Sequence, residues 1–339
     1  PHYRAMSPMK RRVHIVSSTF PTQWPSAEPR FVYDLARGLV PHVGEIHALV
    51  PDAPGLPAEE MWDEVRVRRF TYFRPRSAQG LCYGKGIPAN IRGNPLLVLL
   101  VPFFICAQSW AIGRMVRKHN LDVVNSHWII FQGLAAAIAR MFVRFRHVLQ
   151  IHAAGLYLLL RLPRWVGRPL ARFIVRRADH VVCVSRYVLA RTTELLGYEP
   201  EASISCMGVD TDLFAGTASE EDGDHPRILF VGRMVEKKGV EFLLRAMKGV
   251  HAEVPSARLQ IVGSGEREDE LRALAAGLGL GPEIAEFCGS LPHEDVVEHL
   301  RTARVVAVPS IMDSHGETEG MPTVILEAMA AGKRVVASD

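Results

Sequence analysis

The sequence predicts an α/β protein with two doubly wound domains. Three observations lead to this expectation. The second half of the chain alternates short, β-rich apolar runs with helical patterns, and the first half follows the same order less regularly. Such alternation is typical of parallel sheets that carry helices on both faces. The length of 339 residues is enough for two domains of ordinary size.

The expected elements follow in order along the chain. In the first half, apolar runs predict strands at residues 12–17, 44–50, 64–70, 121–125, 147–151 and 180–184. Helical periodicity there predicts helices at residues 30–40, 96–118, 129–143 and 186–196. In the second half, strands are expected at residues 227–231, 258–262, 285–288, 304–308 and 334–337. Helices are expected there at residues 239–250, 266–279, 293–303 and 322–331.

A linker separates the two expected domains. Residues 217–225 are acidic and contain glycine, as a linker would be. Charge divides in the same region, because residues 1–200 carry 27 Lys+Arg against 12 Asp+Glu, whereas residues 201–339 carry 13 against 24. We therefore expect domains at residues 1–210 and 211–339. The asymmetry indicates separate partners for the basic first half and the acidic second half.

Cysteine usage indicates a reducing compartment. The five cysteines lie far apart and form no CxxC or metal-ligand pattern, so free thiols in a cytoplasmic protein are expected. Residues 13–17 are too short for the core of a secretory signal and fit a first strand instead. We expect neither a metal ion nor another cofactor.

The most informative motif spans residues 319–327. Pro322 predicts the start of a helix, since proline is favoured at the first helical position, so Glu319 would lie on the preceding loop and Glu327 on the second turn. The N–H groups of the first turn form an anion cradle between these two carboxylates. This arrangement suits a ligand that is part phosphate and part sugar. The alternative is that the glutamates only complement the helix dipole.

A second motif follows the expected strand at residues 227–231. The strand ends at Gly232, and the loop before the next helix carries Arg233 and Lys238. Arginine offers a planar fork for phosphate oxygens and lysine a point charge. Ligands of open α/β sheets bind beyond the carboxyl ends of the strands, where this loop falls. We interpret Lys237 as part of a solvated face.

Together the two motifs resemble the family 4 retaining glycosyltransferases, which have the GT-B fold of two Rossmann-like domains facing across a cleft. The loop from Gly232 to Gly239 is similar to the diphosphate-binding loop of that family, and Glu319 and Glu327 match its paired glutamates. Weaker matches lie at residues 261–265, 287–289 and 308–310. The resemblance implies a hexosyltransferase that uses a nucleotide diphosphate sugar and retains the anomeric configuration, in envelope, exopolysaccharide or glycolipid synthesis.

The resemblance also implies roles for single residues. Arg233 and Lys238 would hold the diphosphate, Glu319 and the backbone of residues 320–322 would contact the transferred sugar, and Glu327 the ribose. The expected donor site comprises Gly232, Arg233, Lys238, Gly263, Gly265, Glu319, Gly320, Met321, Pro322, Thr323 and Glu327. The expected catalytic residues are His127, Arg233, Lys238 and Glu319. In the family, more sheet and a helix follow the strand at residues 334–338, so the second domain is expected to be truncated at its C-terminus.

Two histidines follow expected strands of the first half, His127 after residues 121–125 and His152 after residues 147–151. Side chains at such positions face the ligand-binding edge of an α/β sheet, although a lone histidine more often has a structural role. By the resemblance, His127 contacts the donor sugar near the reacting carbon. Both histidines are expected on the cleft, where the acceptor binds.

Two further stretches bear on membrane binding. Residues 96–107 are strongly apolar but too short to span a bilayer, so a buried helix is expected. Residues 156–177 hold six arginines, interleaved aromatic residues and no acid. This pattern is typical of an interfacial segment on anionic lipid, or else of a solvated Arg-rich helix. We expect a peripheral protein at the inner face of the cell membrane, a saccharide or lipid-linked acceptor, and no nucleic-acid partner.

Two other functions stay open. A nucleotide-sugar epimerase of the same fold would need acid/base carboxylates in the cleft, which the paired glutamates argue against. A non-catalytic peripheral membrane scaffold would keep the fold without turnover. Slow hydrolysis of the donor in the absence of an acceptor would separate an enzyme from such a scaffold.

Overall fold

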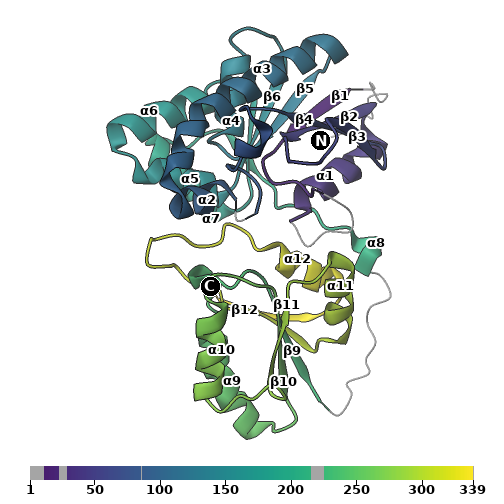
Figure 1. The fold of residues 1–339 in the computed structure, drawn as a ribbon, viewed down its shortest axis with the longest axis vertical. Coiled ribbons are helices and arrows are strands. Elements are labelled where there is room, and N and C mark those ends of the chain that lie inside the picture. The colour runs from purple at the N-terminus through teal and green to yellow at the C-terminus, as the bar shows by residue number, and fades with distance from the viewer. Residues whose placement is uncertain (1–10, 23–28, 85, 215–224, 339) are drawn as a thin grey trace, which may run out of the picture. The chain divides into compact units, whose positions relative to one another are not determined.

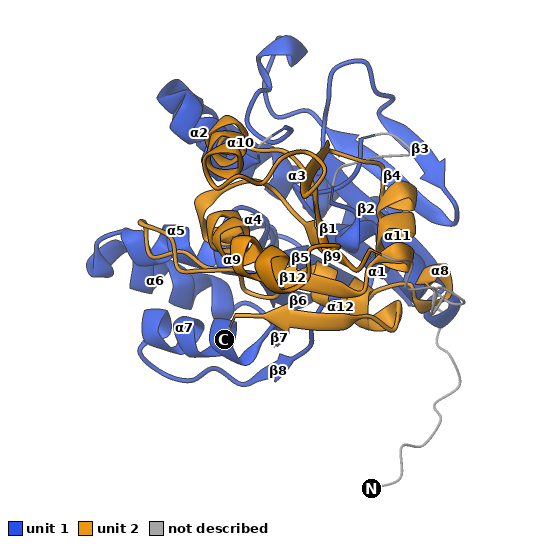
Figure 2. Cartoon of the chain, turned by 90° about the horizontal axis from the view of Figure 1, so that it is seen from below, with its two compact units in different colours: residues 1–22, 28–207 blue, residues 23–27, 208–339 orange. Residues whose placement is uncertain are grey.

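The fold is built on two β-sheets, each in its own unit of the chain (Figures 1 and 2). The computed structural model describes residues 11–22, 29–84, 86–214 and 225–338. Unit 1 comprises residues 1–22 and 28–207, and unit 2 comprises residues 23–27 and 208–339. The expected α/β architecture of two parallel-sheet domains is confirmed. The expected linker lies almost wholly outside the described residues.

Unit 1 contains an eight-stranded sheet in the order β3-β4-β2-β1-β5-β6-β7-β8. Its strands are β1 (Arg12–Val16), β2 (Glu45–Pro51), β3 (Glu59–Trp62), β4 (Val65–Phe70), β5 (Val123–His127), β6 (Arg146–Ile151), β7 (His180–Cys183) and β8 (Ala202–Ile204). Its α-helices are α1 (Phe31–Leu39), α2 (Ile87–Gly93), α3 (Val101–His119), α4 (Gln132–Ala139), α5 (Ala153–Arg161), α6 (Arg164–Val175) and α7 (Arg186–Leu196). The 3₁₀ segments are η1 (Val40–His42), η2 (Arg76–Ala78) and η3 (Pro95–Leu100). All strand pairs are parallel except β3 with β4.

The strand order of unit 1 reverses at β1, which pairs with β2 on one side and β5 on the other. The central strands are buried on both faces, which is why they read as near-continuous apolar runs. Ligands of doubly wound sheets bind at the carboxyl ends of the strands near such a reversal. His127 ends β5, and His152 directly follows β6, so the fold brings both histidines to this edge.

Unit 2 contains a five-stranded parallel sheet in the order β11-β10-β9-β12-β13. Its strands are β9 (Arg227–Val231), β10 (Arg258–Val262), β11 (Ala285–Gly289), β12 (Val305–Val308) and β13 (Arg334–Ala337). Its helices are α8 (Thr211–Phe214), η4 (Glu236–Lys238), α9 (Val240–Glu253), α10 (Glu268–Gly277), α11 (His293–Thr302) and α12 (Thr323–Ala330). Here the order reverses at β9, between β10 and β12.

Two hydrophobic cores cover the two faces of the unit 2 sheet. Successive residues of β9 alternate between them, because side chains of a strand point to opposite faces. Phe230 packs in the core with α9 and α10, and Leu229 packs in the core with α11 and α12. Because helices cover both faces of the sheet, its carboxyl edge is formed by the loops that carry the two motifs.

The observed elements differ from the expected ones at several places. The antiparallel edge strand β3, helices α2, α5 and α6, and strand β8 were not expected as such. The helix expected at residues 96–118 is present as η3 followed by α3, but it is not buried as predicted, because one face is exposed. Strand β5 runs to His127, two residues beyond its expected end.

Candidate functional site

Three loops meet at the carboxyl edge of the unit 2 sheet, after β9, β10 and β11. The backbone N–H of Gly232 donates to the carbonyl of Val262 at 2.9 Å, and that of Met234 donates to Ser264 at 2.9 Å. On the other side, the N–H of Gly263 donates to the carbonyl of Gly289 at 2.7 Å. The three loops therefore form one hydrogen-bonded platform.

Two glycines that were expected to bind the donor allow this platform to close. A Cβ on Gly263 would lie 2.0 Å from the carbonyl oxygen of Gly232, and one on Gly265 would lie 2.4 Å from that of Met234. Both neighbours are backbone atoms that cannot rotate away. Close approach of the loops is therefore a sufficient reason for glycine at both positions, and their contact with a donor stays a prediction.

The loop from Gly232 to Gly239 is also fastened to the segment after β12. Gly239 has a φ of 65°, and a Cβ there would lie 1.8 Å from the carbonyl oxygen of Pro309. The N–H of Ile311 donates to the carbonyl of Lys237 at 2.9 Å. The short 3₁₀ turn η4 is held over the end of β12 as a result, which directs two lysine side chains toward the segment that contains Glu319.

Glu319 forms an ion pair with both lysines of η4. The Nζ of Lys237 lies 2.9 Å from its Oε1, and the Nζ of Lys238 lies 3.3 Å from its Oε2. All three side chains are mostly buried, with 14–18% of their area exposed. The interpretation of Lys237 as solvated was therefore wrong. The direction of its side chain depends on the 3₁₀ turn, which the sequence pattern did not reveal.

The electrostatics of this cluster favour an anion. Burial alone would raise the pKa of Glu319, but Lys238 and Lys237 outweigh it and lower the pKa to about 2. Burial lowers the pKa of Lys238, and so do the charges of Lys237 and Arg233, whereas Glu319 opposes them. Two lysines thus share one carboxylate, and Arg233 adds its charge beside Lys238, which leaves positive charge for a ligand phosphate to neutralise.

Glu236 joins the segment that contains Glu319 to the 3₁₀ turn η4 by two hydrogen bonds. Its Oε1 accepts from the backbone N–H of Ser314 at 2.8 Å, and its Oε2 accepts from the Ser314 hydroxyl at 2.7 Å. Asp313 stabilises the neighbouring turn, because its Oδ1 accepts from the N–H groups of His315 and Glu317. Sequence reasoning missed Glu236 and Ser314. Their 78-residue separation left no local signal of the contact.

Helix α12 begins at Thr323, one residue later than expected, with Pro322 at the N-cap. Glu319, Gly320 and Met321 therefore lie on the loop before the helix, and Glu327 lies on its second turn, half-buried. The N–H groups of the first turn lie between the two carboxylate positions along the chain, as the motif predicted. The structure thus brings Glu319 together with Lys238, and it places Arg233, an exposed side chain, near enough for its charge to act on Lys238.

In unit 1, the histidine pair forms a hydrogen-bonded chain. Asn125 donates from Nδ2 to the carbonyl of Val148 at 3.3 Å, so its Oδ1 is left to accept from His127 Nε2 at 3.0 Å. Burial holds the pKa of His127 well below its usual range, so the ring is neutral and its Nδ1 is an acceptor. His152 Nε2, at 3.1 Å, then donates to it. The network therefore assigns the lone pair of His152 to Nδ1.

This chain makes His152 the outer member of the pair. His127 is fully buried, whereas His152 is half-buried, and the two rings stack with centroids 5.3 Å apart. Burial lowers the pKa of His152 to about 3, so this ring is also neutral at physiological pH. Trp128, whose ring centroid lies 4.7 Å from that of His152, has a φ of 70°, and Phe131 has a φ of 63°. Such strained residues cluster at functional sites.

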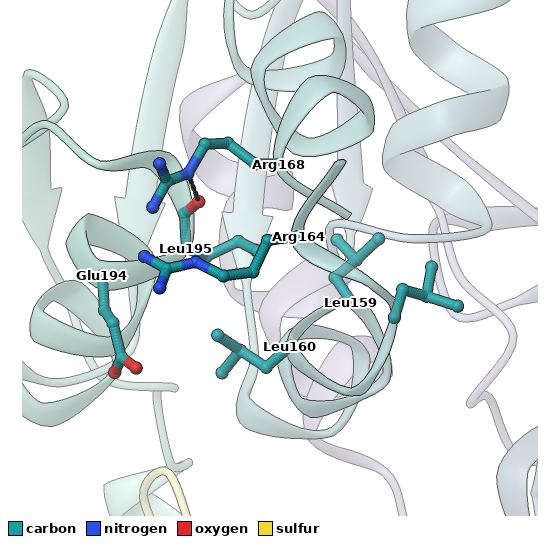
Figure 3. Close-up of a pocket in the computed structure, with 7 residues that line it drawn as sticks. Leu159, Leu160, Arg164, Arg168, Glu194 and Leu195 are labelled. Atoms are coloured by element: carbon teal, nitrogen blue, oxygen red, sulfur yellow. Dashed lines mark hydrogen bonds between the residues drawn. The ribbon is translucent and has the colours of Figure 1, made fainter. Parts of the chain in front are cut away.

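The Arg-rich residues 156–177 lie on α5 and α6, beside a small cavity (Figure 3). The cavity measures about 150 Å³, which is small for a nucleotide sugar. Arg168 donates to the carbonyl of Leu195 at 3.2 Å, and Arg172 donates to that of Leu196 at 2.8 Å. These arginines satisfy the carboxyl end of α7, where cations are favoured by the helix dipole. At least two of the six arginines therefore have a structural role.

No group of three or more His, Cys, Asp or Glu side chains is placed to hold a metal ion in the part of the chain that the structure describes. The cations of unit 2 and the neutral histidines of unit 1 are thus the chemically distinctive groups at the two carboxyl edges.

Comparison with known proteins assigns the family. The model of the glycosyl transferase 4-like domain matches residues 29–203, and that of glycosyl transferases group 1 matches residues 216–339. A GDP-mannose-dependent alpha-(1-6)-phosphatidylinositol monomannoside mannosyltransferase from Mycolicibacterium smegmatis is 35% identical over 239 residues, which are 66% of this chain and 60% of that protein. A putative colanic acid biosynthesis glycosyltransferase, WcaL, from Salmonella typhimurium is 32% identical over a segment that covers 49% of this chain and 40% of that protein.

Solved structures show the same fold. Sucrose-phosphate synthase from Thermosynechococcus elongatus superposes with a TM-score of 0.71 at 21% identity, over 96% of this chain and 81% of that chain. Anabaena HepE, in complex with UDP and glucose, gives a TM-score of 0.62 at 17% identity, over 96% of this chain and 80% of that chain. The fold is therefore that of the GT-B glycosyltransferases. The chain belongs to the glycosyl transferase 4-like family and spans about 60% of the length of the first curated relatives that it matches.

Proposed function

We propose that the protein transfers a hexose from a nucleotide diphosphate sugar to a saccharide or lipid-linked acceptor, with retention of the anomeric configuration. The observation that carries the proposal is the ion pair of Lys237 and Lys238 with Glu319 at the carboxyl edge of the unit 2 sheet, with the charge of Arg233 acting on Lys238. Family membership supports it, as does the GDP-mannose dependence in the names of the mycobacterial relatives.

In this proposal the donor diphosphate competes with Glu319 for the lysines. The diphosphate oxygens bind Lys238 and Arg233, and the N–H groups at the start of α12 donate further hydrogen bonds to them. Glu319, released from Lys238, then accepts from hydroxyls of the transferred sugar together with the backbone of residues 320–322. Glu327 accepts from the ribose, and Thr323, Gly232, Gly263 and Gly265 border the donor. These assignments follow the motif positions, which lie on loops at this edge except for Thr323 and Glu327 in the first two turns of α12.

The chemistry rests on charge stabilisation of the leaving diphosphate. As the glycosidic bond to the diphosphate breaks, Lys238 and Arg233 stabilise the developing negative charge. The attacking hydroxyl gives its proton to a diphosphate oxygen, and no carboxylate nucleophile and no divalent metal are required. The contact with the reacting sugar was expected from His127, but both of its ring nitrogens are engaged, by Asn125 and by His152. We therefore propose that His152 accepts a hydrogen bond at Nδ1 from a sugar hydroxyl, and that His127 orients His152.

The acceptor side is proposed from charge and from relatives. Unit 1 carries the basic half of the chain, which suits an anionic lipid surface. The mycobacterial relatives are named for a phosphatidylinositol mannoside acceptor, and WcaL for colanic acid synthesis. We therefore propose a cytoplasmic protein that works peripherally at the inner face of the cell membrane, in envelope or exopolysaccharide synthesis, with no nucleic-acid partner.

A turnover assay tests the proposal. The protein is incubated with GDP-mannose, UDP-glucose or ADP-glucose and a membrane-lipid extract, with and without EDTA, and nucleoside diphosphate release is measured. Release with one donor, unaffected by EDTA and with an α-linked product by NMR, is the expected result. An inverted product contradicts the mechanism. Absence of release with every donor contradicts the function.

A further inference from the structure

An exposed apolar stripe runs along η3 and α3 of unit 1 (α3 in Figure 1). It consists of Leu96, Leu99, Phe103, Cys106 and Trp110, which repeat at helical spacing and are all exposed. The exposed fractions are 72% for Leu96, 66% for Leu99, 54% for Phe103 and 66% for Trp110. The stripe is roughly 20 Å long at the rise of a helix. Contiguous exposed apolar side chains of this kind mark a site of interaction with a protein or a membrane.

The opposite face of the same helix fixes it to unit 1. Phe104 is fully buried, with its ring centroid 5.3 Å from that of Phe70 and 6.2 Å from that of Phe131. Ile112 is buried on the same side. By length and composition, residues Pro95–His119 could cross a bilayer. Because one face is committed to the core of unit 1, the helix instead presents its other face at the surface.

The charges around the stripe indicate what covers it. Residues 65–178 contain 19 Lys and Arg and one acidic residue, Asp122. At the carboxyl end of the stripe, the guanidinium of Arg114 lies 5.3 Å over the ring of Trp110, and Arg117 follows one turn later. An apolar face with a tryptophan at its end and basic side chains beyond it is the pattern of a helix that lies in the interface of an anionic bilayer.

We propose that the apolar stripe docks unit 1 on a bilayer that contains anionic lipids. The inference rests on the proposed function for its membrane-bound acceptor, and it assigns the contact to α3 rather than to the Arg-rich residues 156–177. The side chains of the stripe enter the acyl boundary, and Arg114, whose guanidinium lies over Trp110, meets the lipid phosphates. Arg117 already donates to the carbonyl of Phe142 at 3.1 Å. Arg168 and Arg172 likewise already donate to the carboxyl end of α7.

Vesicle co-sedimentation tests the docking. The protein is mixed with vesicles of phosphatidylcholine, with or without phosphatidylglycerol, and the bound fraction is measured for wild type, Phe103→Glu and Leu99→Glu. Each variant is expected to lower the partition coefficient about tenfold or more, since it replaces apolar contact with a charge. The control is Phe242→Glu, which makes the same change at a phenylalanine of unit 2 that is 47% exposed. This control is expected to bind vesicles as wild type does. Equal binding by all four proteins overturns the proposal.

Tryptophan quenching separates the two surfaces of unit 1. Trp110 lies on the stripe and Trp165, 79% exposed, lies on α6 among the arginines. Brominated acyl chains in the vesicles are expected to quench wild type and Trp165→Phe alike, and to lose most of this quenching with Trp110→Phe. Loss of quenching in Trp165→Phe instead places the contact on α6 and overturns the assignment to α3.

Melting temperature and oligomeric state complete the test of the docking. Leu99→Glu is expected to keep the wild-type melting temperature, because this side chain is 66% exposed, whereas Phe103→Glu also loses an edge-to-face contact with Phe73. Both variants are expected to keep the donor-induced shift in melting temperature, because the stripe lies in unit 1 and the donor loops lie in unit 2. In the wild-type protein, a donor response without vesicle binding overturns the docking and leaves the proposed function intact. Vesicle binding without any donor response contradicts the proposed function and leaves the docking intact. If the stripe variants change only the oligomeric state in solution, the stripe is an interface between copies of the chain, and the docking proposal is wrong.

Discussion

Glu319 is held by two ammonium groups in the absence of a ligand, which makes it a competitor of the donor diphosphate as well as a partner of its sugar. Its pKa of about 2 means that it stays ionised throughout the physiological range. The balance of the site therefore depends on whether carboxylate or phosphate occupies Lys238. Replacing the charge while keeping the shape of the side chain separates these two roles.

Glu319→Gln is expected to bind a nucleoside diphosphate about three- to tenfold more tightly, because a negative charge beside the phosphates is removed. The same variant is expected to turn over more slowly, since the transferred sugar loses a charged acceptor. Calorimetric titration with the diphosphate and steady-state kinetics with the sugar donor measure the two effects. Weaker binding of the diphosphate would contradict the competition, whatever the turnover.

At the scale of elements, η4 and the segment from Pro309 to Glu319 are joined by hydrogen bonds into one unit, which we call the clamp. Glu236 accepts two hydrogen bonds from Ser314, and the N–H of Ile311 donates to Lys237. Glu236→Ala removes both bonds to Ser314, whereas Ser314→Ala removes only the hydroxyl bond. Because the clamp positions Glu319 against Lys238, its loss is expected to change the affinity for the donor more than the overall stability.

The KM for the donor is accordingly expected to rise several-fold in Glu236→Ala and less in Ser314→Ala, with kcat changed less than KM. The melting temperatures of both variants are expected to stay near that of wild type, because these two hydrogen bonds are exposed to solvent. The kinetic constants and a melting curve are measured side by side. A purely structural role would show as a fall in melting temperature with an unchanged KM.

The close approach of η4 to β12 makes Gly239 sensitive to substitution. In Gly239→Ala the new Cβ would lie 1.8 Å from a backbone oxygen at a φ of 65°, so a loss of about 2 kcal/mol or more is expected. Gly249→Ala, in the open middle of α9, is the control and is expected to stabilise by up to about 1 kcal/mol. Urea unfolding measures both. Equal stabilities for the two variants would refute the packing of this loop.

The same elements show what the sequence could and could not reveal. Strand β9 matched its expected bounds, because an apolar run ended by Gly232 leaves few alternatives. Strand β3 (Glu59–Trp62) was missed, since it is a short, largely polar edge strand that owes its pairing to β4. Lys237 was misinterpreted because the 3₁₀ turn that directs it depends on a contact with Pro309, far along the chain. Local patterns therefore predicted the loops of the site but not the ion pairs within it.

At the scale of the whole molecule, unit 1 contains neutral histidines, buried or half-buried, that oppose folding in acid. Burial is the largest cause that lowers the pKa of His14 to about 3, of His147 to about 4 and of His152 to about 3. An unfolded chain protonates each of them below its ordinary pKa of about 6.5. Between these limits the unfolded state binds more protons than the folded state, so the free energy of unfolding falls as the pH falls.

Each such histidine contributes a slope that approaches about 1.4 kcal/mol per pH unit below pH 6. Urea unfolding at a series of pH values between neutral and mildly acidic is expected to show this loss. His14→Leu removes one titrating group and is expected to flatten the slope by one such contribution, and the comparison is made with the wild-type protein. An unaltered slope in His14→Leu would contradict the assignment of this histidine as neutral in the folded state.

The most direct test of the central claim is the thermal stability of the protein with and without UDP, GDP, ADP and their common sugar conjugates, measured for wild type and Lys238→Ala. A ligand at a hundred times its dissociation constant stabilises the folded state by about 2.7 kcal/mol. We predict a clear upward shift of the melting temperature for one base and its sugar conjugate, lost in Lys238→Ala and retained in Lys248→Ala, which changes an exposed lysine of α9. No shift with any nucleotide, or an equal shift in Lys238→Ala, would contradict the account of the donor site.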